Sequence, residues 1–362
     1  MKVLVAMSGG VDSSVAAARL IAGGHEVVGV TMKLWGGESD TGCCSVSDVD
    51  DARRVAQQLD IPHHVWNFGD AFDARVVEPY VEAHRRGVTP NPCIECNRHL
   101  KFDRLLRRAD AVGFEAVATG HHARIVERPD GTRRLARGAD AAKDQSYVLY
   151  VLGQAELART LLPVGDMTKD EVRAEAERLG LRTADKPDSQ DVCFITSTGG
   201  RGGFLGRRIE LRPGRIVDET GRDVGAVDAV ELVTVGQRRG LGLPGGGAPR
   251  YVVDVDVPGA TVRVGPERDL LSDGVVLEQV VWAATPATGH VTAQCSAHGA
   301  PRSATVEPAT GDRMAVRFDA PHRRVAVGQS VVLYDGDEVV GGGIVAAGAA
   351  AETPVGAPGT AV

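Results

Sequence analysis

The amino-acid sequence predicts an α/β protein with an N-terminal doubly wound parallel sheet, followed by two small β-rich domains. Up to about residue 197, apolar strand-like runs alternate with helix-like segments, which is typical of a parallel sheet covered by helices on both faces. Beyond it, Gly and Pro become frequent, helical periodicity disappears and short β-like runs follow one another. We therefore expect domain boundaries near 197–203 and 270–274.

The first strand and the first helix are joined by the most informative segment of the chain. Residues 2–7 form an apolar, β-prone run that leads into Ser8-Gly9-Gly10-Val11-Asp12-Ser13-Ser14, and an Ala-rich helix follows to residue 21. The two glycines allow a tight turn, and the N–H groups and positive dipole end of the helix attract an anion. The segment lacks the lysine of a Walker loop, which favours gripping and releasing pyrophosphate over hydrolysis of a γ-phosphate.

The later elements of the first half continue this alternation. We predict strands at 27–32, 63–68 and 116–119, and helices at 47–59 with Ser47 as N-cap, at 72–86, and from a Thr168–Glu171 capping box to 179. Ligands bind at the carboxyl ends of parallel strands, so the Gly9-Gly10 turn, Met32 and Gly120 are expected along one rim. In the second half, β-like runs lie at 215–218, 251–257, 262–264, 275–282, 314–318, 330–334 and 339–345.

Composition and charge are ordinary for a globular protein of 362 residues, with 43% hydrophobic and 25% charged residues. No stretch is apolar for long enough to span a bilayer, and the N-terminus has no signal-peptide layout. We therefore expect a cytoplasmic protein with no membrane partner, whose six cysteines are reduced, reactive or metal-binding thiols. The net charge of −7 argues mildly against a nucleic-acid partner, but local basic clusters around Arg85, Arg98 and Arg207 keep a polyanionic substrate open.

Two cysteine-bearing segments are candidates for chemistry. Residues 89–97 contain two prolines, which predict a stiff, extended, exposed loop carrying Cys93 and Cys96. This Cys-x-x-Cys pair is compatible with half a zinc site, a redox pair, or a nucleophile with a neighbour. The adjacent pairs Cys43-Cys44 and His121-His122 are poorly spaced to complete a zinc site. Cys193 follows a polar turn, and its local sequence alone favours a buried cysteine in an apolar strand.

Seven motifs in order resemble the tRNA-specific 2-thiouridylase (MnmA) family of PP-loop ATP pyrophosphatases. They are the Ser8–Ser14 segment, Gly42-Cys43-Cys44-Ser45, Thr89-Pro90-Asn91-Pro92 with Cys96-Asn97, Ala118-Thr119-Gly120-His121, Lys143-Asp144-Gln145-Ser146-Tyr147, Cys193-Phe194-Ile195 and Gly236-Gln237-Arg238-Arg239-Gly240-Leu241-Gly242. The resemblance covers about residues 1–345. It implies a PP-loop catalytic domain at 1–197, a tRNA-recognition domain at 198–271 and a C-terminal β-barrel at 272–346. The remaining residues are mostly Ala, Gly, Pro and Thr with almost no charge, which predicts a disordered tail at 347–362.

The resemblance also implies a role for individual residues. Cys193 matches the cysteine that carries a persulfide, and Cys96 matches the nucleophile that works with it and can form a transient disulfide with it. The residues that match the ATP site are Ala6, Met7, Ser8, Gly9, Gly10, Val11, Asp12, Ser13, Met32 and Gly120. The residues that match contacts to the target base and to tRNA are Asn91, Pro92, Cys93, Lys143, Asp144 and Gln145.

The implied activity is 2-thiolation of the wobble uridine (U34) of tRNA with ATP and Mg²⁺. The implied partners are lysine, glutamate and glutamine tRNAs and a cysteine desulfurase or sulfur-relay protein.

Two positions depart from the family pattern. Cys93 stands where some members have Asp, so Cys93, Cys96 and Cys193 could instead ligate a 4Fe-4S cluster. Cys295-Ser296-Ala297-His298 replaces an Arg-Tyr-Arg tRNA contact. A PP-loop amidating ligase and a non-catalytic RNA-binding protein are the alternative functions.

Overall fold

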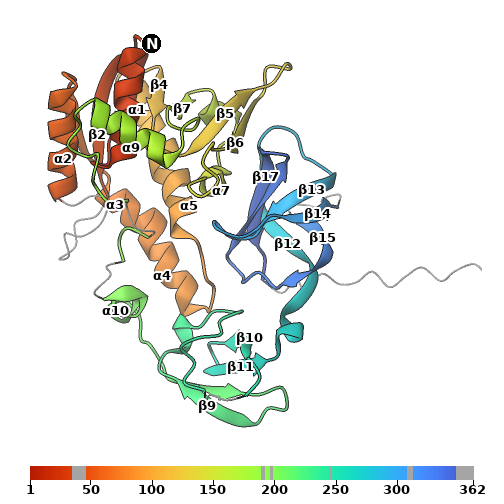
Figure 1. The fold of residues 1–362 in the computed structure, drawn as a ribbon. Helices are drawn as coiled ribbons and strands as arrows, with labels where there is room; N and C mark the ends of the chain where they lie inside the picture. The colour runs from red at the N-terminus through yellow and green to blue at the C-terminus, as the bar shows by residue number, and fades with distance from the viewer. Residues whose placement is uncertain (35–45, 189–191, 196–198, 244–246, 308–312, 348–362) are drawn as a thin grey trace, which may run out of the picture.

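The computed structural model describes residues 1–34, 46–188, 192–195, 199–243, 247–307 and 313–347. The predicted cysteine motif at 42–45 and the tail at 348–362 lie outside the described residues. Three units follow one another along the chain: an N-terminal α/β unit, a small β unit and a C-terminal barrel (Figure 1).

The N-terminal unit contains the predicted parallel sheet. Five strands pair in the order β3-β2-β1-β4-β7, and every pairing is parallel. The strands are β1 (Lys2–Ala6), β2 (Glu26–Lys33), β3 (His63–Asn67), β4 (Ala116–Ala118) and β7 (Thr160–Leu161). The four strands expected from sequence are thus confirmed within one or two residues at each end, whereas the two-residue β7 was missed because it is too short to show a pattern.

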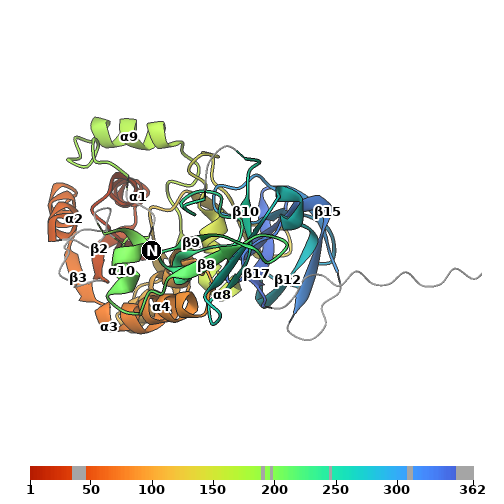
Figure 2. The same cartoon turned by 90° about the horizontal axis from the view of Figure 1, so that it is seen from below.

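Helices cover both faces of this sheet, which explains why β1 is apolar throughout. Val3 and Val5 face one buried cluster, and Leu4 faces the other. The first face is covered by α1 (Val11–Ala22), α2 (Val46–Gln58) and α9 (Lys169–Arg178). The second is covered by α3 (Gly69–Phe72), η1 (Asp73–Val77), α4 (Glu78–Arg85), α5 (Pro92–Cys96), η2 (Asn97–Arg104) and α6 (Leu105–Ala111). Figure 2 shows α1 and α9 on one side of the strands and α3 and α4 on the other.

Three helix starts differ in how well the sequence predicted them. The capping box of α9 is confirmed: Thr168 Oγ1 accepts from the Glu171 N–H, and Glu171 Oε2 accepts from the Thr168 N–H at 2.7 Å. The predicted N-cap at Ser47 is wrong, because α2 already begins at Val46. The helix predicted at 72–86 begins earlier, at Gly69, and its middle turn is a π-helix.

The second half of the chain forms two β units. The small unit has the strand order β10-β11-β8-β9. In the C-terminal unit, β12 pairs with both β15 and β17, and this double pairing closes a β-barrel. The bounds are α10 (Gly200–Gly206), β8 (Gly214–Val217), β9 (Asp223–Val227), η3 (Val230–Leu232), β10 (Tyr251–Asp256), β11 (Thr261–Gly265), η4 (Glu267–Leu270), β12 (Leu271–Trp282), β13 (Gly289–Gln294), β14 (Arg302–Val306), β15 (Met314–Arg323), β16 (Ser330–Asp335) and β17 (Glu338–Val345).

A hairpin that the sequence did not reveal attaches the barrel to the N-terminal unit. It consists of β5 (Ala123–Glu127) and β6 (Arg133–Arg137), and β6 pairs with the barrel strand β17 at Glu338. Next to it lie the short helices α7 (Ser146–Leu149) and α8 (Gln154–Leu157). Tyr147 Oη donates to the Ser330 carbonyl at 2.8 Å, and the Tyr334 hydroxyl lies 3.0 Å from Ser146 Oγ. These buried hydrogen bonds fix α7 against the barrel.

A substitution at Gly342 in β17 tests whether the N-terminal unit packs on the barrel in this way. A Cβ added to it would lie 2.7 Å from Tyr150 Cδ2 and 2.8 Å from the Val331 carbonyl oxygen, so Gly342→Ala must displace Tyr150 or the strand. We expect a loss of about 1–3 kcal/mol in the free energy of unfolding, measured by urea denaturation. Gly203→Ala is the control, because an added Cβ there meets nothing within 4 Å. Equal stability of the two variants would show that Tyr150 does not pack on β17 in solution.

Candidate functional site

A closed glycine turn connects β1 to α1. Gly9 has φ of +74°, and an added Cβ would lie 2.3 Å from the Asp48 carbonyl oxygen, so only glycine fits there. The Ser8 N–H donates to Ser13 Oγ at 3.2 Å, and Ser13 Oγ donates to the Gly10 carbonyl at 3.1 Å. Gly10 is the N-cap and has no side chain that could cap the first turn of α1. The turn therefore presents the N–H groups of the helix start, as an anion site requires.

Gly120 and Met32, the other two positions expected at the carboxyl ends of the strands, also lie at this edge of the sheet. Gly120 follows β4 and packs directly on the first turn of α1, because an added Cβ would lie 2.5 Å from the Ser13 nitrogen. Met32 lies near the carboxyl end of β2 and is buried in the cluster that contains Leu4. Met7 and Val11 are buried in the opposite cluster, so their backbone rather than their side chains can face a ligand.

The sequence analysis missed two side chains that meet Asp12 at this turn. His122 Nε2 donates to Asp12 Oδ1 at 3.0 Å, and Lys169 Nζ donates to Asp12 Oδ1 and Oδ2 at 2.7 and 2.8 Å. Burial on its own raises the pKa of Asp12, but the hydrogen bonds from His122 and Lys169 together outweigh it, so the pKa is lowered below its ordinary value. Asp12 is therefore ionised at neutral pH. No local pattern indicated this contact, because 157 positions separate Lys169 from Asp12.

Asp188 extends this charged group toward two predicted site segments. Its carboxylate accepts from Lys143 Nζ at 2.7 Å, lies 2.8 Å from Lys169 Nζ, and accepts from Arg173 Nη2 at 2.9 Å. Burial raises its pKa, but the hydrogen bonds from Lys143 and Lys169 lower it more, to about 2. The structure thus connects the segment before Cys193, the 143–145 segment and the glycine turn through ion pairs.

The three residues Lys143, Asp144 and Gln145 have different surroundings. Asp144 accepts from Arg137 Nη1 and the Gly138 N–H, both at 3.0 Å, and its side chain is 7% exposed. Gln145 Oε1 accepts from the His122 N–H at 3.0 Å. Asp144 and Gln145 therefore stabilise the protein's own loops, whereas the side chain of Lys143 is 43% exposed. Of the three, Lys143 is the one whose charge reaches solvent.

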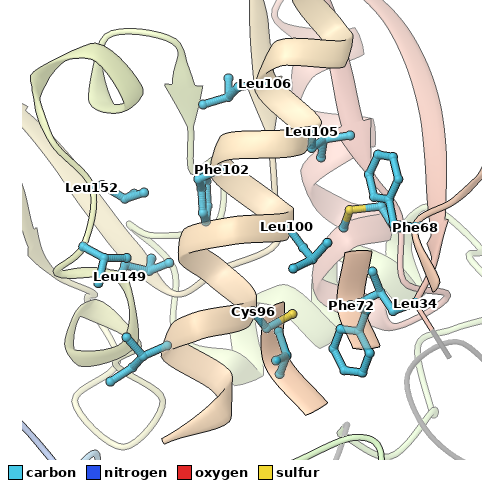
Figure 3. Packing of buried hydrophobic residues seen from close by; sticks show 14 of the residues in the cluster. Leu34, Phe68, Phe72, Cys96, Leu100, Phe102, Leu105, Leu106, Leu149 and Leu152 are labelled. Carbon is cyan, nitrogen blue, oxygen red and sulfur yellow. The ribbon is translucent and has the colours of Figure 1, made fainter. Parts of the chain in front are cut away.

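The prediction of an extended, exposed loop at 89–97 is wrong in its second half. Pro92–Cys96 form the helix α5, because Asn91 Oδ1 accepts from the Cys93 N–H at 3.0 Å and Pro92 occupies the first helical position. The helix turns Cys96 inward, where it is 8% exposed, while Cys93 is half-buried. Figure 3 shows Cys96 among buried side chains near Leu100 and Phe72.

Cys193 packs against the same apolar cluster as Cys96. It lies in a turn rather than in a strand, is half-buried, and precedes Phe194, whose ring contacts Phe72 at 5.6 Å and Tyr80 at 5.5 Å between centroids. Phe194 thus anchors this segment on α3 and α4, in the cluster that also contains Cys96. The described cysteines Cys93, Cys96, Cys193 and Cys295 are all thiols rather than disulfides.

The 4Fe-4S alternative would require Cys93, Cys96 and Cys193 to be grouped around one site. Within the described ranges, no three His, Cys, Asp or Glu side chains are grouped so that they could hold a metal ion, and this includes Cys93, Cys96 and Cys193. We therefore derive no step through a cluster. No helix in the part of the chain that the structure describes is long and apolar enough to cross a membrane.

Two further segments bear on tRNA binding: the Gly236–Gly242 motif of the expected tRNA-recognition domain, and the barrel segment at Cys295, where the family's Arg-Tyr contact is missing. In the Gly236–Gly242 motif, Gln237 Nε2 donates to the Arg239 carbonyl at 2.8 Å, and the tight turn leaves Arg238 and Arg239 exposed. In the barrel, Gln294 Nε2 donates to the Ser296 and Ala297 carbonyls at 3.1 and 3.0 Å, and burial raises the pKa of Cys295 to about 11. Cys295 is thus a neutral packing residue and offers no charge to a phosphate.

The chain is similar to known proteins over nearly its whole length. Three family profiles match: a tRNA methyl transferase HUP domain at 1–197, a tRNA methyl transferase PRC-barrel domain at 202–266 and an aminomethyltransferase beta-barrel domain at 272–345. The tRNA-specific 2-thiouridylase MnmA of Mycobacteroides abscessus is 49% identical over 360 residues, which cover 95% of this chain and 99% of that protein. The protein of the same name from Beutenbergia cavernae is 48% identical over 362 residues, covering 96% and 95% of the two chains.

Among solved structures, a 4-thiouridine synthetase–RNA complex with bound ATP matches 53% of this chain and 44% of its own. Its sequence identity is 19% and its TM-score is 0.37, which is too low to support an inference.

Proposed function

The chain belongs to the tRNA-specific 2-thiouridylase family, and from this we propose that it is a tRNA-uridine 2-sulfurtransferase that uses ATP to thiolate uridine at C2. We further propose U34 of lysine, glutamine and glutamate tRNAs as the target, the cytoplasm as the location, and a cysteine desulfurase or sulfur-relay protein as the sulfur source. The proposed working units are residues 1–197, 198–271 and 272–346. The observation that carries the proposal is the glycine turn at α1, covered by Gly120, in a domain whose one apolar cluster includes Cys96 and is also contacted by Cys193.

The first step is activation of the uracil C2 oxygen. A C2 carbonyl is a poor electrophile and its oxygen a poor leaving group, so the oxygen attacks the α-phosphate of ATP, and pyrophosphate leaves. ATP enters as its Mg²⁺ complex, and the N–H groups of the turn at Gly9 and Gly10 stabilise the phosphates. The absence of a Walker lysine from this turn suits a pyrophosphate product that must be released.

The second step delivers sulfur from a persulfide on Cys193. The Cys96 thiolate attacks Sγ of Cys193, the bond from Sγ to the terminal sulfur breaks, and hydrosulfide is released next to the activated base. Hydrosulfide adds to C2, and AMP leaves with the original oxygen. The two cysteines end as a disulfide, two electrons more oxidised than two thiols, so a cellular thiol reductant must reduce it before the next turnover. A disulfide needs the two Cα atoms within roughly 7 Å. Both cysteines pack in one apolar cluster, and the mechanism requires their two segments to move to this distance during the sulfur step.

Contacts to tRNA are proposed at Asn91, Pro92 and Cys93 for the base, and at Lys143 for the backbone. Arg238 and Arg239 in the central unit are exposed and supply positive charge on a protein whose net charge is −7. The target uridine must leave its stack to expose C2, as in other enzymes that modify bases.

The proposal predicts which substrates produce AMP. The full chain incubated with ATP, Mg²⁺, unmodified tRNA and a persulfide donor should release AMP and pyrophosphate and yield 2-thiouridine. AMP is measured by chromatography of the nucleotides, and 2-thiouridine by chromatography of the digested tRNA. Omitting tRNA should remove AMP formation. An amidating ligase would instead need ammonia and no tRNA, and a non-catalytic RNA-binding protein would release no AMP under either condition.

A further inference from the structure

Lys169 is buried at a place where the first turn of α9 meets the first turn of α1. The residue is 8% exposed, and lysine is rarely buried unless its charge is paired. Its Nζ lies 2.7 and 2.8 Å from the two Asp12 oxygens and 2.8 Å from Asp188 Oδ1. Its backbone N–H donates to Asp140 Oδ2 at 3.0 Å, which fixes the start of α9. The ammonium is therefore held in a defined position beside the glycine turn.

The glycine turn needs a cation from elsewhere in the protein if it is to bind a polyphosphate. The glycine turn itself contains no lysine, and its one charged side chain, Asp12, is ionised and would repel a polyphosphate. His122 is the other side chain that contacts Asp12, and its single Nε2–H is already directed at Oδ1. Lys169 thus places a positive charge on Asp12, in the first turn of α1. The phosphates of ATP are proposed to bind at this same turn.

The other contacts of Asp188 allow Lys169 to leave it for a phosphate oxygen. Asp188 also accepts from Lys143 Nζ at 2.7 Å and Arg173 Nη2 at 2.9 Å, so it stays paired if Lys169 leaves it. An ammonium has three donors, and Asp12 needs no more than two of them. One donor of Lys169 can therefore pass from Asp188 to a phosphate oxygen without breaking the Asp12 contact.

We propose that Lys169 is a phosphate-binding residue of the ATP site, which exchanges Asp188 for an oxygen of the β- or γ-phosphate when ATP binds. The cation that a Walker loop carries in its own sequence is supplied here from α9. This assignment rests on the proposed function, since it needs ATP at the glycine turn. A purely structural role for Lys169, as the counter-ion of Asp12, makes a different prediction, because it is indifferent to the number of phosphates on the nucleotide.

The test compares ATP with AMP as calorimetric probes of the full-length chain. Lys169→Gln should weaken ATP binding about 10- to 100-fold, the range expected for one hydrogen bond between charged groups, and should leave AMP binding unchanged. Equal weakening of both nucleotides, or unchanged ATP binding, would overturn the assignment. Arg178→Gln is the matched control, because Arg178 is a cation of the same helix that pairs with Glu175 at the opposite end of α9, and it should leave ATP binding unchanged.

A second variant keeps the proposal testable if Lys169→Gln does not fold. Asp188→Asn removes the charge that competes with phosphate for Lys169, so ATP binding should tighten while AMP binding does not change. Weaker or equal ATP binding by this variant would contradict the exchange. Failure of the proposed function is a separate outcome, because the wild-type protein would then bind no ATP at all or release no AMP with tRNA.

Discussion

Replacing either Cys96 or Cys193 with serine should abolish 2-thiolation of tRNA while ATP binding remains at the wild-type level. A serine hydroxyl can neither carry the transferable sulfur nor attack a persulfide, so no fraction of the sulfur step survives. Neither thiol lies in the glycine turn, and α5 and the Cys193 segment pack on the opposite face of the sheet from α1. The measurements are 2-thiouridine in digested tRNA and nucleotide binding by calorimetry.

Cys93→Ser is the matched control for this experiment. Cys93 lies one helical turn from Cys96 in α5 and is half-buried, yet it stands outside the proposed sulfur relay. We therefore expect the variant to keep most of its thiolation activity. If it were inactive, and if anaerobically purified wild-type protein contained iron that the variant lacked, the persulfide mechanism would be wrong and a three-cysteine cluster would replace it.

Asp12→Ala should reduce tRNA-dependent AMP formation by at least roughly 100-fold, the scale of misplacing a preorganised donor at a reacting phosphate. Asp12 orients Lys169 and His122 over the first turn of α1, and both lose this partner when the carboxylate is removed. Asp188 still pairs with Lys169, so the variant should fold. AMP is measured with saturating tRNA, and thermal unfolding checks the fold.

Asp170→Ala serves as the control for Asp12→Ala. Asp170 is an exposed carboxylate in the first turn of α9, adjacent to Lys169 in sequence, and it has the same charge as Asp12. AMP formation should be unchanged in this variant. If Asp12→Ala produced AMP at the rate of Asp170→Ala, the glycine turn would not be the ATP site.

Features that depend on neighbouring residues were predictable from sequence. The strand, the glycine turn and α1 follow from apolar periodicity and from a turn that only glycine can adopt at Gly9. The start of α9 follows from hydrogen bonds between Thr168 and Glu171, three positions apart. The helix α5 was missed although its signal is local, because Asn91 as N-cap with Pro92 at the first helical position was interpreted only as a helix-breaking proline.

Local patterns, and motifs in a fixed order, were enough to predict the fold class, the parallel sheet, the glycine turn and the family. Other contacts could be seen only in the folded protein: Lys169 and His122 meet Asp12, Asp144 is bonded within the protein, and the β5–β6 hairpin joins β17 of the barrel. Each of these contacts joins side chains or strands that no local periodicity relates. Their partners are set by the packing of the sheet, its helices and the barrel, which brings charges that are distant in sequence into partly buried positions where water screens them less.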